Sequence, residues 1–480
     1  MAPSRPHSLR RITLLALGLV AIFIWLFSHY QSHAPEGEAT AAEEHSPISS
    51  TAHGQFWRQL QPLLTRWAPN CEPPGRHAKA ESEGFDPKNT QQPPNLTDMS
   101  DEDVLKMKHA HRNFVHAITK DPPTLAYRPG TRGIVSTAGG AYLPVLVISL
   151  RMLRQTGSNL PMEVFLADWD EYDGYICQVV LPALNAQCVL LSAILDTVPG
   201  STSHIEKYQY KPFAMLFSSF EEILFLDADA FPLHKPEHVF TSDPFRSKGL
   251  LTWPDFWRTT TSPLYYVIAG QDRPAPNLRQ STESGEVFLS KRSHLRTLLL
   301  VAYYNYWGPG YYYPLLSQGA AGEGDKETFL AAATVFDEPF YQVSEPLRAL
   351  GRHTNDGFSG STMVQYSPME DYALTSNGEW RIKGADVDPP SPFFVHINFP
   401  KFNPATVFSE NGPVVKEDGS YTLAWTAPED VLQSFGPHLQ RQLWHEIRWT
   451  ACALEGKSIS WKGQTGICDK VEDYWNTVFS

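Results

Sequence analysis

The stretch Lys207–Pro232, KYQYKPFAMLFSSFEEILFLDADAFP, constrains the fold of this chain more than any other. Within it, Ile223–Leu226 is a short and wholly apolar run, the pattern of a strand that is buried on both faces. The run stops at Asp227-Ala228-Asp229, so two carboxylates follow the carboxyl end of the strand. Ligands bind at that edge of open α/β sheets, and residues two apart in extended chain point the same way. The sequence therefore predicts an α/β fold with both acids at a ligand-binding edge.

Two carboxylates beside an apolar core suit a hard divalent cation. The acids lie between the apolar run Ile223–Leu226 and Phe231-Pro232, so both charges are near a core. A charge there is costly unless a group of opposite charge pairs with it. Mg²⁺ and Mn²⁺ are held by one or two carboxylates while substrate phosphates complete the coordination. Solvated turns and phosphatases of the haloacid dehalogenase type also contain Asp-X-Asp, but in those phosphatases the strand usually opens the domain. We therefore predict that Asp227 and Asp229 bind Mn²⁺ or Mg²⁺.

The pattern of alternating strands and helices extends well beyond this stretch. Apolar runs at Gly133–Thr137, Met162–Leu166 and Cys188–Leu191 predict strands that precede the acids, and Tyr142–Gln155 has apolar residues at helical spacing. Together with the strand at Ile223–Leu226, this order predicts an α/β domain with a mostly parallel central sheet.

A tight turn, Ala138-Gly139-Gly140, joins the first predicted strand to the helix that follows it. Glycine lets the backbone approach a ligand closely, and the amino terminus of a helix favours anions. The turn lacks the full dinucleotide fingerprint. Gly139 and Gly140 therefore indicate the floor of a nucleotide-sugar site rather than an NAD site.

Polar residues also flank two later apolar runs. Glu283-Ser284-Gly285-Glu286 leads into the predicted strand Val287–Leu289, and His396 ends the predicted strand Phe393–Val395. Lys401 follows five residues after His396, where it can reach a diphosphate. A lone His is more often structural than a ligand, but one His with two Asp is a mixed nitrogen and oxygen set that Mn²⁺ tolerates. We therefore add His396 to the predicted metal ligands.

Two further residues each have two interpretations. Lys211 lies on the predicted helix Tyr208–Ser218, where it is either solvated or in contact with a donor phosphate. Asp325, in Gly324–Phe329, either caps the helix that begins there or faces the substrate. The ring-rich segment Tyr303–Pro314 is predicted to be a loop, and it forms either an exposed sugar-binding lip or a buried packing element.

The amino-terminal region predicts a membrane anchor. Arg5, Arg10 and Arg11 precede an uncharged run, Ile12–Ser28, of about 17 residues, which as a helix spans roughly 25 Å. Basic residues before the run and acidic residues after it place the amino terminus in the cytosol, with a cleaved signal peptide as the alternative. The predicted organisation is a cytosolic tail at 1–11, a transmembrane signal anchor at 12–28, a partly disordered lumenal stem at 29–130 and a folded domain at 131–480.

Charge and cysteine content limit the partners and the compartment. The formal net charge of −13 over 480 residues, without clustered Lys and Arg, argues against nucleic acid as a partner. In an oxidising lumen the five cysteines make two pairs with one left over. Proximity favours Cys452 with Cys468 and Cys177 with Cys188, although the sequence alone does not determine connectivity.

From about Gly133 to Pro404 the chain resembles glycosyltransferase family 71, the fungal Golgi α-mannosyltransferases that build and branch mannan. The matching segments are GIVSTAGGAY, RMLRQTGSNLPMEV, YQYKPFA, FLDADAFP, ESGEVFLSK, GDKETFL and HINFPKFNP. Their order is also similar to that of glycogenin-like enzymes, and the resemblance implies a GT-A-like nucleotide-sugar-binding domain. One departure is Glu286, where the family pattern leads us to expect Gln, so the role of this residue is open.

The resemblance implies a role for each candidate residue. Asp227, Asp229 and His396 would hold Mn²⁺, Lys211 and Lys401 would contact the diphosphate of the donor, and Glu283, Ser284 and Asp325 would face the mannose or its acceptor. The donor would be GDP-mannose and the acceptor an oligomannoside of a glycoprotein or of cell-wall mannan.

The function implied is a retaining mannosyltransferase in the Golgi membrane, a single-pass type II protein with a lumenal catalytic domain and other mannosyltransferases as complex partners. Two alternatives stay open. One is a transferase of similar fold that uses a UDP-sugar, and the other is a catalytically silent, membrane-anchored lectin or scaffold subunit. The sequence does not indicate whether the linkage formed is α-1,2 or α-1,3.

Overall fold

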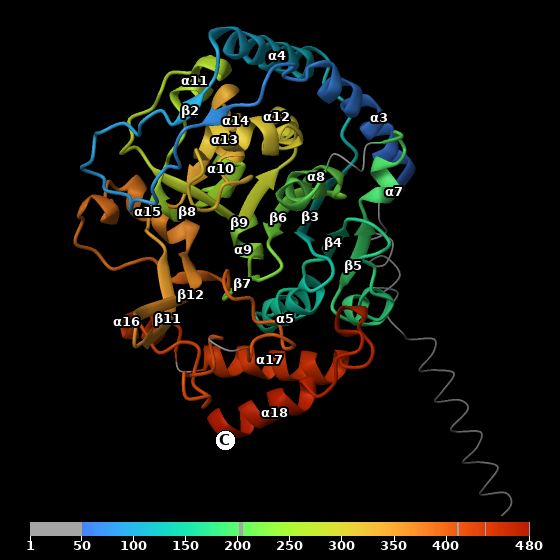
Figure 1. Ribbon diagram of the computed structural model, residues 1–480, viewed down its shortest axis with the longest axis vertical. Helices are drawn as coiled ribbons and strands as arrows, with labels where there is room; N and C mark the ends of the chain where they lie inside the picture. Colours follow the sequence, from blue (N-terminus) through green and yellow to red (C-terminus); the bar gives the residue numbers. More distant parts are fainter. Residues whose placement is uncertain (1–49, 201–204, 410–411, 437, 480) are drawn as a thin grey trace, which may run out of the picture. The chain divides into compact units, whose positions relative to one another are not determined.

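The central sheet positions everything that follows. In the computed structural model, which describes residues 50–200, 205–409, 412–436 and 438–479, this sheet has seven strands (Figure 1). Their order is β10 (Tyr341–Gln342), β8 (Leu250–Arg258), β9 (Gln280–Ser290), β6 (Phe220–Leu226), β3 (Arg128–Thr137), β4 (Met162–Leu166) and β5 (Ala186–Leu190).

Strand direction in this sheet is mostly parallel. The strands β6, β3, β4 and β5 are parallel neighbours, and β10 is parallel to β8. Strand β9 runs antiparallel to both β6 and β8. The predicted α/β class and mostly parallel sheet are therefore confirmed, and β3 and β6 end at the same edge.

A second, antiparallel sheet begins directly after the two acids. Its order is β11 (Arg348–Thr354), β12 (Gly357–Tyr366), β13 (Pro392–His396) and β7 (Ala230–Pro232). Strand β7 pairs with β13 so that Ala230 lies opposite His396. Because β7 follows Asp229 without a break, this pairing brings His396 beside the acids of a strand more than a hundred residues earlier in the chain.

The β6 strand is buried on both faces, as its wholly apolar sequence predicts. Leu224 and Leu226 belong to one apolar cluster, and Ile223 and Phe225 belong to the other. The first cluster is completed by α5 (Tyr142–Gln155), α17 (Leu439–Leu454) and α18 (Ile467–Val478), and the second by α3 (Ser50–Arg66), α4 (Asp101–Lys120), α8 (Tyr210–Phe217) and α12 (Leu295–Tyr306). In Figure 1, α17 and α18 lie side by side below α5.

Shorter elements connect these layers. The remaining helices are α6 (Leu181–Ala183), α7 (Ser192–Leu195), α9 (Glu237–Phe240), α10 (Phe245–Lys248), α11 (Pro263–Ala269), α13 (Tyr313–Ser317), α14 (Thr328–Val335), α15 (Pro368–Ser376) and α16 (Glu429–Ser434). Single turns of other helix types and a two-stranded ribbon complete the described elements: η1 (Ile176–Val180), η3 (Lys207–Gln209), η4 (Gly308–Tyr312), η5 (Arg381–Lys383), η6 (Ile459–Trp461), β1 (Gly75–Arg76) and β2 (Thr97–Asp98).

The region assigned to a stem is partly a component of the core. One compact unit covers 48–480. On α3, Phe56, Trp57, Leu60 and Leu64 are each no more than 1% exposed, because they pack against α8 and its neighbours. The described part of the predicted stem, 50–130, folds in the same compact unit as the sheet, which therefore begins well before the boundary predicted at residue 131.

The ring-rich segment is also different from the exposed lip considered above. It contains the end of α12, the turn η4 and α13, and Tyr303, Tyr304 and Tyr312 are fully buried. The hydroxyl of Tyr303 donates to the carbonyl of Trp67, and the indole of Trp307 donates to the carbonyl of Leu64. The segment is buried because the chain from α3 onward covers it.

Both predicted disulfides are present, Cys177–Cys188 and Cys452–Cys468, and Cys71 is free. The second joins the end of α17 to the start of α18. None of the helices in the part of the chain that the structure describes has the length and hydropathy to cross a bilayer. The predicted tail at 1–11 and anchor at Ile12–Ser28 lie outside the described residues.

Candidate active site

The acids after β6 are held at the sheet edge by a backbone contact to β9. The amide of Asp227 donates to the carbonyl of Gly285 at 2.7 Å, and the amide of Ile397 donates to the carbonyl of Asp229 at 2.9 Å. These bonds join β6, β9 and β13 at one point. The side chain of Asp229 is buried, whereas that of Asp227 is half-buried.

The three predicted metal ligands come together. Ligand atoms of Asp227, Asp229 and His396 all lie within 4.8 Å of one another. The Nε2 atom of His396 is 3.3 Å from Oδ1 of Asp229. Two carboxylates and an imidazole at these separations fit a divalent cation such as Mn²⁺.

Lys401 also reaches this cluster, where its ammonium group contacts Oδ2 of Asp229. Burial alone would raise the pKa of Asp229, but the charges of His396 and Lys401 lower it below its usual range. Asp229 is therefore ionised at neutral pH. The predicted contact between Lys401 and a donor diphosphate stays a prediction, and the position of Lys401 beside the metal ligands is compatible with it.

Lys211 is buried, so its interpretation as a solvated helix lysine is wrong. Its Nζ donates to the carbonyl of Ser284 at 2.6 Å and to the hydroxyl of Ser284 at 3.0 Å. It also lies 3.3 Å from Oδ1 of Asp227 and 3.3 Å from Oδ2 of Asp325. Burial alone would lower the pKa of Lys211, but the nearby carboxylates raise it above its usual value. Its charge therefore joins α8 to three segments of the site.

Asp325 does not cap the helix that follows it. Helix α14 begins at Thr328, and the side chain of Asp325 instead accepts a hydrogen bond from the hydroxyl of Ser284 at 2.9 Å. Asp325 and Ser284 are both buried. The second interpretation, a carboxylate that faces into the site, is the one that agrees with this geometry.

Glu283 lies on the other side of the imidazole. Its Oε1 is 3.7 Å from Nδ1 of His396, and its Oε2 accepts the amide of Gly285 at 2.6 Å. Burial would raise the pKa of Glu283, but His396, Lys211 and the amide of Gly285 lower it to about 2. An added Cβ at Gly285 would lie 2.6 Å from the ring of His396, so only glycine lets the imidazole approach β9 this closely.

Glu286 is fully buried, and neither of its carboxylate oxygens has a hydrogen-bond partner among the described residues. With Glu283 and His396 it forms a second group of ligand atoms within 4.8 Å. The Nδ1 atom of His396 also has no hydrogen-bond partner there, because Oε1 of Glu283 is 3.7 Å away. Burial, and then the charges of Glu283 and Asp227, raise the pKa of Glu286 well above its usual value. Glu286, which stands where the family pattern leads us to expect Gln, therefore lies behind the predicted metal ligands.

The glycine turn lies at the same edge, where β3 ends. An added Cβ at Gly139 would lie 2.0 Å from Oε2 of Glu171, and Gly140 has a positive φ of 49°. The side-chain amide of Asn403 donates to the carbonyl of Ala141 at 2.9 Å, so the segment that carries Lys401 contacts the turn. The position of Gly139 and Gly140 is compatible with the floor of a nucleotide site.

Sequence reasoning missed an ion pair next to these residues. Lys326 donates to Oδ2 of Asp255 at 2.6 Å, and both side chains are buried. Asp255 lies on β8, seventy-one residues before its partner. The only sign of this ion pair in the sequence is that Asp255 is an acid within an apolar strand. No local pattern indicates that its partner is a lysine seventy-one residues later.

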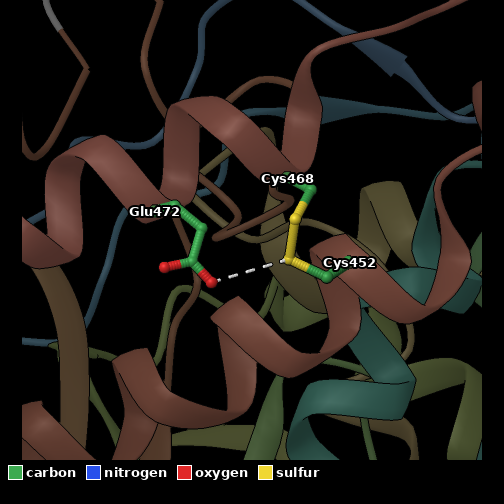
Figure 2. A group of neighbouring side chains, drawn as sticks. All are labelled: Cys452, Cys468 and Glu472. Carbon is green, nitrogen blue, oxygen red and sulfur yellow. Dashed lines mark hydrogen bonds between the residues drawn. A yellow bond between two sulfur atoms is a disulfide. The ribbon is translucent and has the colours of Figure 1, made fainter.

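A third group of ligand-type residues is not a metal site. Figure 2 shows Cys452 and Cys468 joined by their disulfide, with Oε1 of Glu472 at 4.0 Å from Sγ of Cys452. Cysteine binds metals as a thiolate, and two cysteines joined by a disulfide have no thiolate to offer. Glu472 is instead paired with Arg448 at 2.6 Å.

Comparisons with known proteins identify the family of this chain. A family model described as "Mannosyltransferase putative" matches residues 131–278 and 275–367. The chain is 34% identical to the α-1,2-mannosyltransferase MNN21 of Candida albicans, over 73% of this chain and 60% of that protein. It is also 34% identical to MNN2 of Saccharomyces cerevisiae, over 70% of this chain and 66% of that protein. The chain belongs to this family of mannosyltransferases.

Solved structures are more distant. The galactosyltransferase LgtC, in complex with donor and acceptor sugar analogues, aligns at 12% identity and a TM-score of 0.34, over 63% of this chain and 99% of that one. At this score the likeness carries no argument about function. The chain spans about three-fifths of the length of the curated relatives it matches, with 60%, 55% and 66% of the first three covered.

Proposed function

We propose that this protein transfers mannose from GDP-mannose to a hydroxyl group of an α-mannoside, with retention of configuration and with Mn²⁺ or Mg²⁺ bound. The observation that carries the proposal is the convergence of Asp227, Asp229 and His396 beside Lys401. Family membership supports mannose as the transferred sugar.

The residues present fit a divalent cation. Asp227 and Asp229 would hold it through carboxylate oxygens and His396 through Nε2, while Nδ1, which has no partner among the described residues, faces Glu283. A carboxylate behind a ligating imidazole is a common way to fix its orientation. When bound, the cation supplies a Lewis acid that offsets the charge developing on the departing diphosphate, an effect of several kcal/mol.

The protein itself would contribute charge and position. Lys401 is paired with Asp229, and from there its ammonium group would contact the diphosphate, while Lys211 holds Asp227, Ser284 and Asp325 in place. A fixed set of charges in a buried site stabilises a transition state without reorganisation.

The reaction is a group transfer between two oxygens. An acceptor hydroxyl oxygen bonds to C1 of the mannosyl group, the bond from C1 to the diphosphate oxygen breaks with both electrons going to GDP, and the hydroxyl proton passes to the departing diphosphate. Retention requires that the new bond forms on the face from which GDP leaves.

We also propose that the protein is a single-pass type II protein of the Golgi membrane, with an oligomannoside as acceptor and other mannosyltransferases as complex partners. The two disulfides support this, because such bonds persist in oxidising compartments of the secretory pathway.

Purified protein from residue 48 onward, given Mn²⁺ and an α-mannoside, should consume GDP-mannose and lose activity with a chelator. Asp229→Ala should lower the rate at least a hundredfold, and the exposed Asp356→Ala is the matched control. Full activity in Asp229→Ala would contradict the metal site.

The donor and the reaction class are tested separately. Consumption of a UDP-sugar with GDP-mannose left intact would contradict the donor, and glycan binding without nucleotide or metal binding would indicate a lectin. The anomeric configuration of the product, measured by NMR, tests retention.

A further inference from the structure

A hollow of about 330 Å³ lies beside the candidate active site, where β8 ends and β9 begins. This volume is within the range of small-ligand sites. Its lining comes from five separate parts of the chain. These include Asp255 and Phe256 of β8, Gln280 of β9, Phe85 of the amino-terminal region, Leu347 before β11, and Ile382 of η5.

The polar part of the lining consists of two buried side chains, Gln280 and Asp255. Gln280 is only 6% exposed, and its side-chain amide makes no hydrogen bond within the described part of the chain. Asp255 is also 6% exposed, and its carboxylate is held by Lys326 at 2.6 Å and by the amide of Phe256 at 2.7 Å. The amide of Gln280 lines the hollow, and its oxygen and nitrogen can bond a ligand that both donates and accepts hydrogen bonds.

The rest of the lining selects the kind of ligand. Phe85 and Phe256 are half-buried rings, and Leu347 and Ile382 add aliphatic surface. None of the described residues that line the hollow is a Lys or an Arg, and the carboxylate of Asp255 is already paired with Lys326, so the lining offers an anion no positive charge from these residues. Apolar walls with an amide and a carboxylate fit a neutral ligand that has many hydroxyl groups and an apolar ring face, and they disfavour a phosphate.

The residues that form the hollow are only a few positions along the chain from residues of the candidate active site. Gln280 precedes Glu283 by three residues on β9, which is about 10 Å along a strand. Lys326, which holds Asp255, directly follows Asp325. A chain of a few sugars can span this separation, with one end at Glu283 and Asp325 and another unit in the hollow.

We propose that the hollow is an acceptor subsite, which binds a neutral hexose unit of the acceptor glycan at some distance from the hydroxyl that is glycosylated. The inference rests on the proposed transfer and identifies where the acceptor lies. It also gives a role to the amino-terminal region, because Phe85 belongs to a segment that Arg258 of β8 holds through the carbonyl of Glu83 at 2.9 Å.

The test compares a short acceptor with a longer one. With GDP-mannose saturating, KM is measured for methyl α-mannoside and for an α-linked mannotriose, in the unmodified protein, in Gln280→Ala and in Phe85→Ala. Each variant should raise the KM for the mannotriose about tenfold, consistent with the loss of one or two neutral hydrogen bonds or of one ring contact. The KM for methyl α-mannoside and for GDP-mannose should not change.

The exposed Gln464→Ala is the matched control and should behave as the unmodified protein. Phe85 lies outside the described helices and strands, so its variant keeps the test informative if Gln280→Ala folds poorly. Equal changes for both acceptors, or none, would overturn the subsite.

Direct binding separates this inference from the proposed function. If the unmodified protein consumes no GDP-mannose, mannotriose binding is measured by calorimetry without donor. Binding that is lost in both Gln280→Ala and Phe85→Ala would support the subsite even though the transfer had failed. Absence of binding to the unmodified protein, or binding that both variants retain, would overturn it.

Discussion

At the scale of single residues, His396 is the group on which most contacts of the site converge. A carboxylate oxygen of Asp229 is 3.3 Å from its Nε2, and one of Glu283 is 3.7 Å from its Nδ1. Burial would lower the pKa of His396, but these two carboxylates raise it well above its usual value. In the cation-free protein its stabilising contribution is therefore fully present below the unfolded-state pKa of about 6.5, and it is lost as the pH rises through the higher folded-state pKa.

Metal binding should oppose this protonation. A ligating imidazole nitrogen must be free of its proton, so Mn²⁺ binding should release a proton from His396 and become about tenfold tighter per pH unit above 6.5, until the folded-state pKa is reached. Calorimetry in two buffers of different ionisation enthalpy measures both quantities. Proton release that persists unchanged in His396→Gln would show that another group is responsible.

Gly285→Ala tests how closely the imidazole must approach β9. The added Cβ would lie 2.6 Å from the ring of His396 and 2.9 Å from Oε2 of Glu283, so the ring must move. We expect about 10- to 100-fold weaker Mn²⁺ binding, as for other losses of support behind a metal ligand, with the fold retained. Gly310→Ala, where nothing lies within 4 Å of the added Cβ, is the control. Equal Mn²⁺ affinity in the two variants would contradict this geometry.

Glu286→Gln tests the carboxylate that has no partner. A carboxyl with a raised folded-state pKa binds its proton more tightly when folded, so its contribution to stability declines as the pH rises above about 4.3. Without a cation, the variant should be more stable at pH 7 by about 1–3 kcal/mol and should show less of that decline. Denaturant unfolding at pH 5 and pH 7 measures it, and a less stable variant at both pH values would contradict the interpretation.

At the scale of elements, the predicted helices and strands agree best with the structure where the sequence pattern that predicts them lies within the element itself. The predicted ranges Met162–Leu166 and Tyr142–Gln155 match β4 and α5, because alternation and helical spacing are properties of the segment itself. The strands β6 and β9 are longer than predicted, since Glu221 and Glu286 are polar residues inside them. The Tyr303–Pro314 segment has no periodic signal, and its burial depends on α3, which is distant in the sequence.

The pair α17 and α18 should depend on its disulfide. The bond closes a loop of 16 residues, and a loop of this length typically contributes about 3 kcal/mol. Cys452→Ser combined with Cys468→Ser should lower the free energy of unfolding by about that amount and leave activity at 25 °C intact. Denaturant titration under non-reducing conditions measures the change. An unchanged unfolding free energy would show that packing of α17 on α5 is sufficient.

At the scale of the whole molecule, the position of α3 and α4 decides where the folded unit begins. Phe56, Trp57, Leu60 and Leu64 of α3, and Met107, Phe114 and Ile118 of α4, are at most 1% exposed. Full burial of each is worth about 1.5–3 kcal/mol, so together they are comparable to the total stability of a typical domain, about 5–15 kcal/mol.

A chain that begins at residue 131 should therefore fail to fold, whereas one that begins at residue 48 should fold. Soluble yield and thermal unfolding of the two proteins compare them directly. A cooperative transition at the same temperature in the shorter protein would show that α3 and α4 are dispensable.

The sequence by itself determined the parts of this protein that depend on neighbouring residues: an apolar strand followed by two acids, and a glycine turn before a helix. The tertiary structure alone decided that Glu286 lies unpaired behind His396, that Lys211 joins Ser284 to Asp227 and Asp325, and that 50–130 folds in one unit with the sheet. The reason is that periodicity and turn preference are encoded over a few residues. The distances between Glu286, His396 and Lys211 depend instead on how strands from remote parts of the chain pair, and a local pattern does not record this.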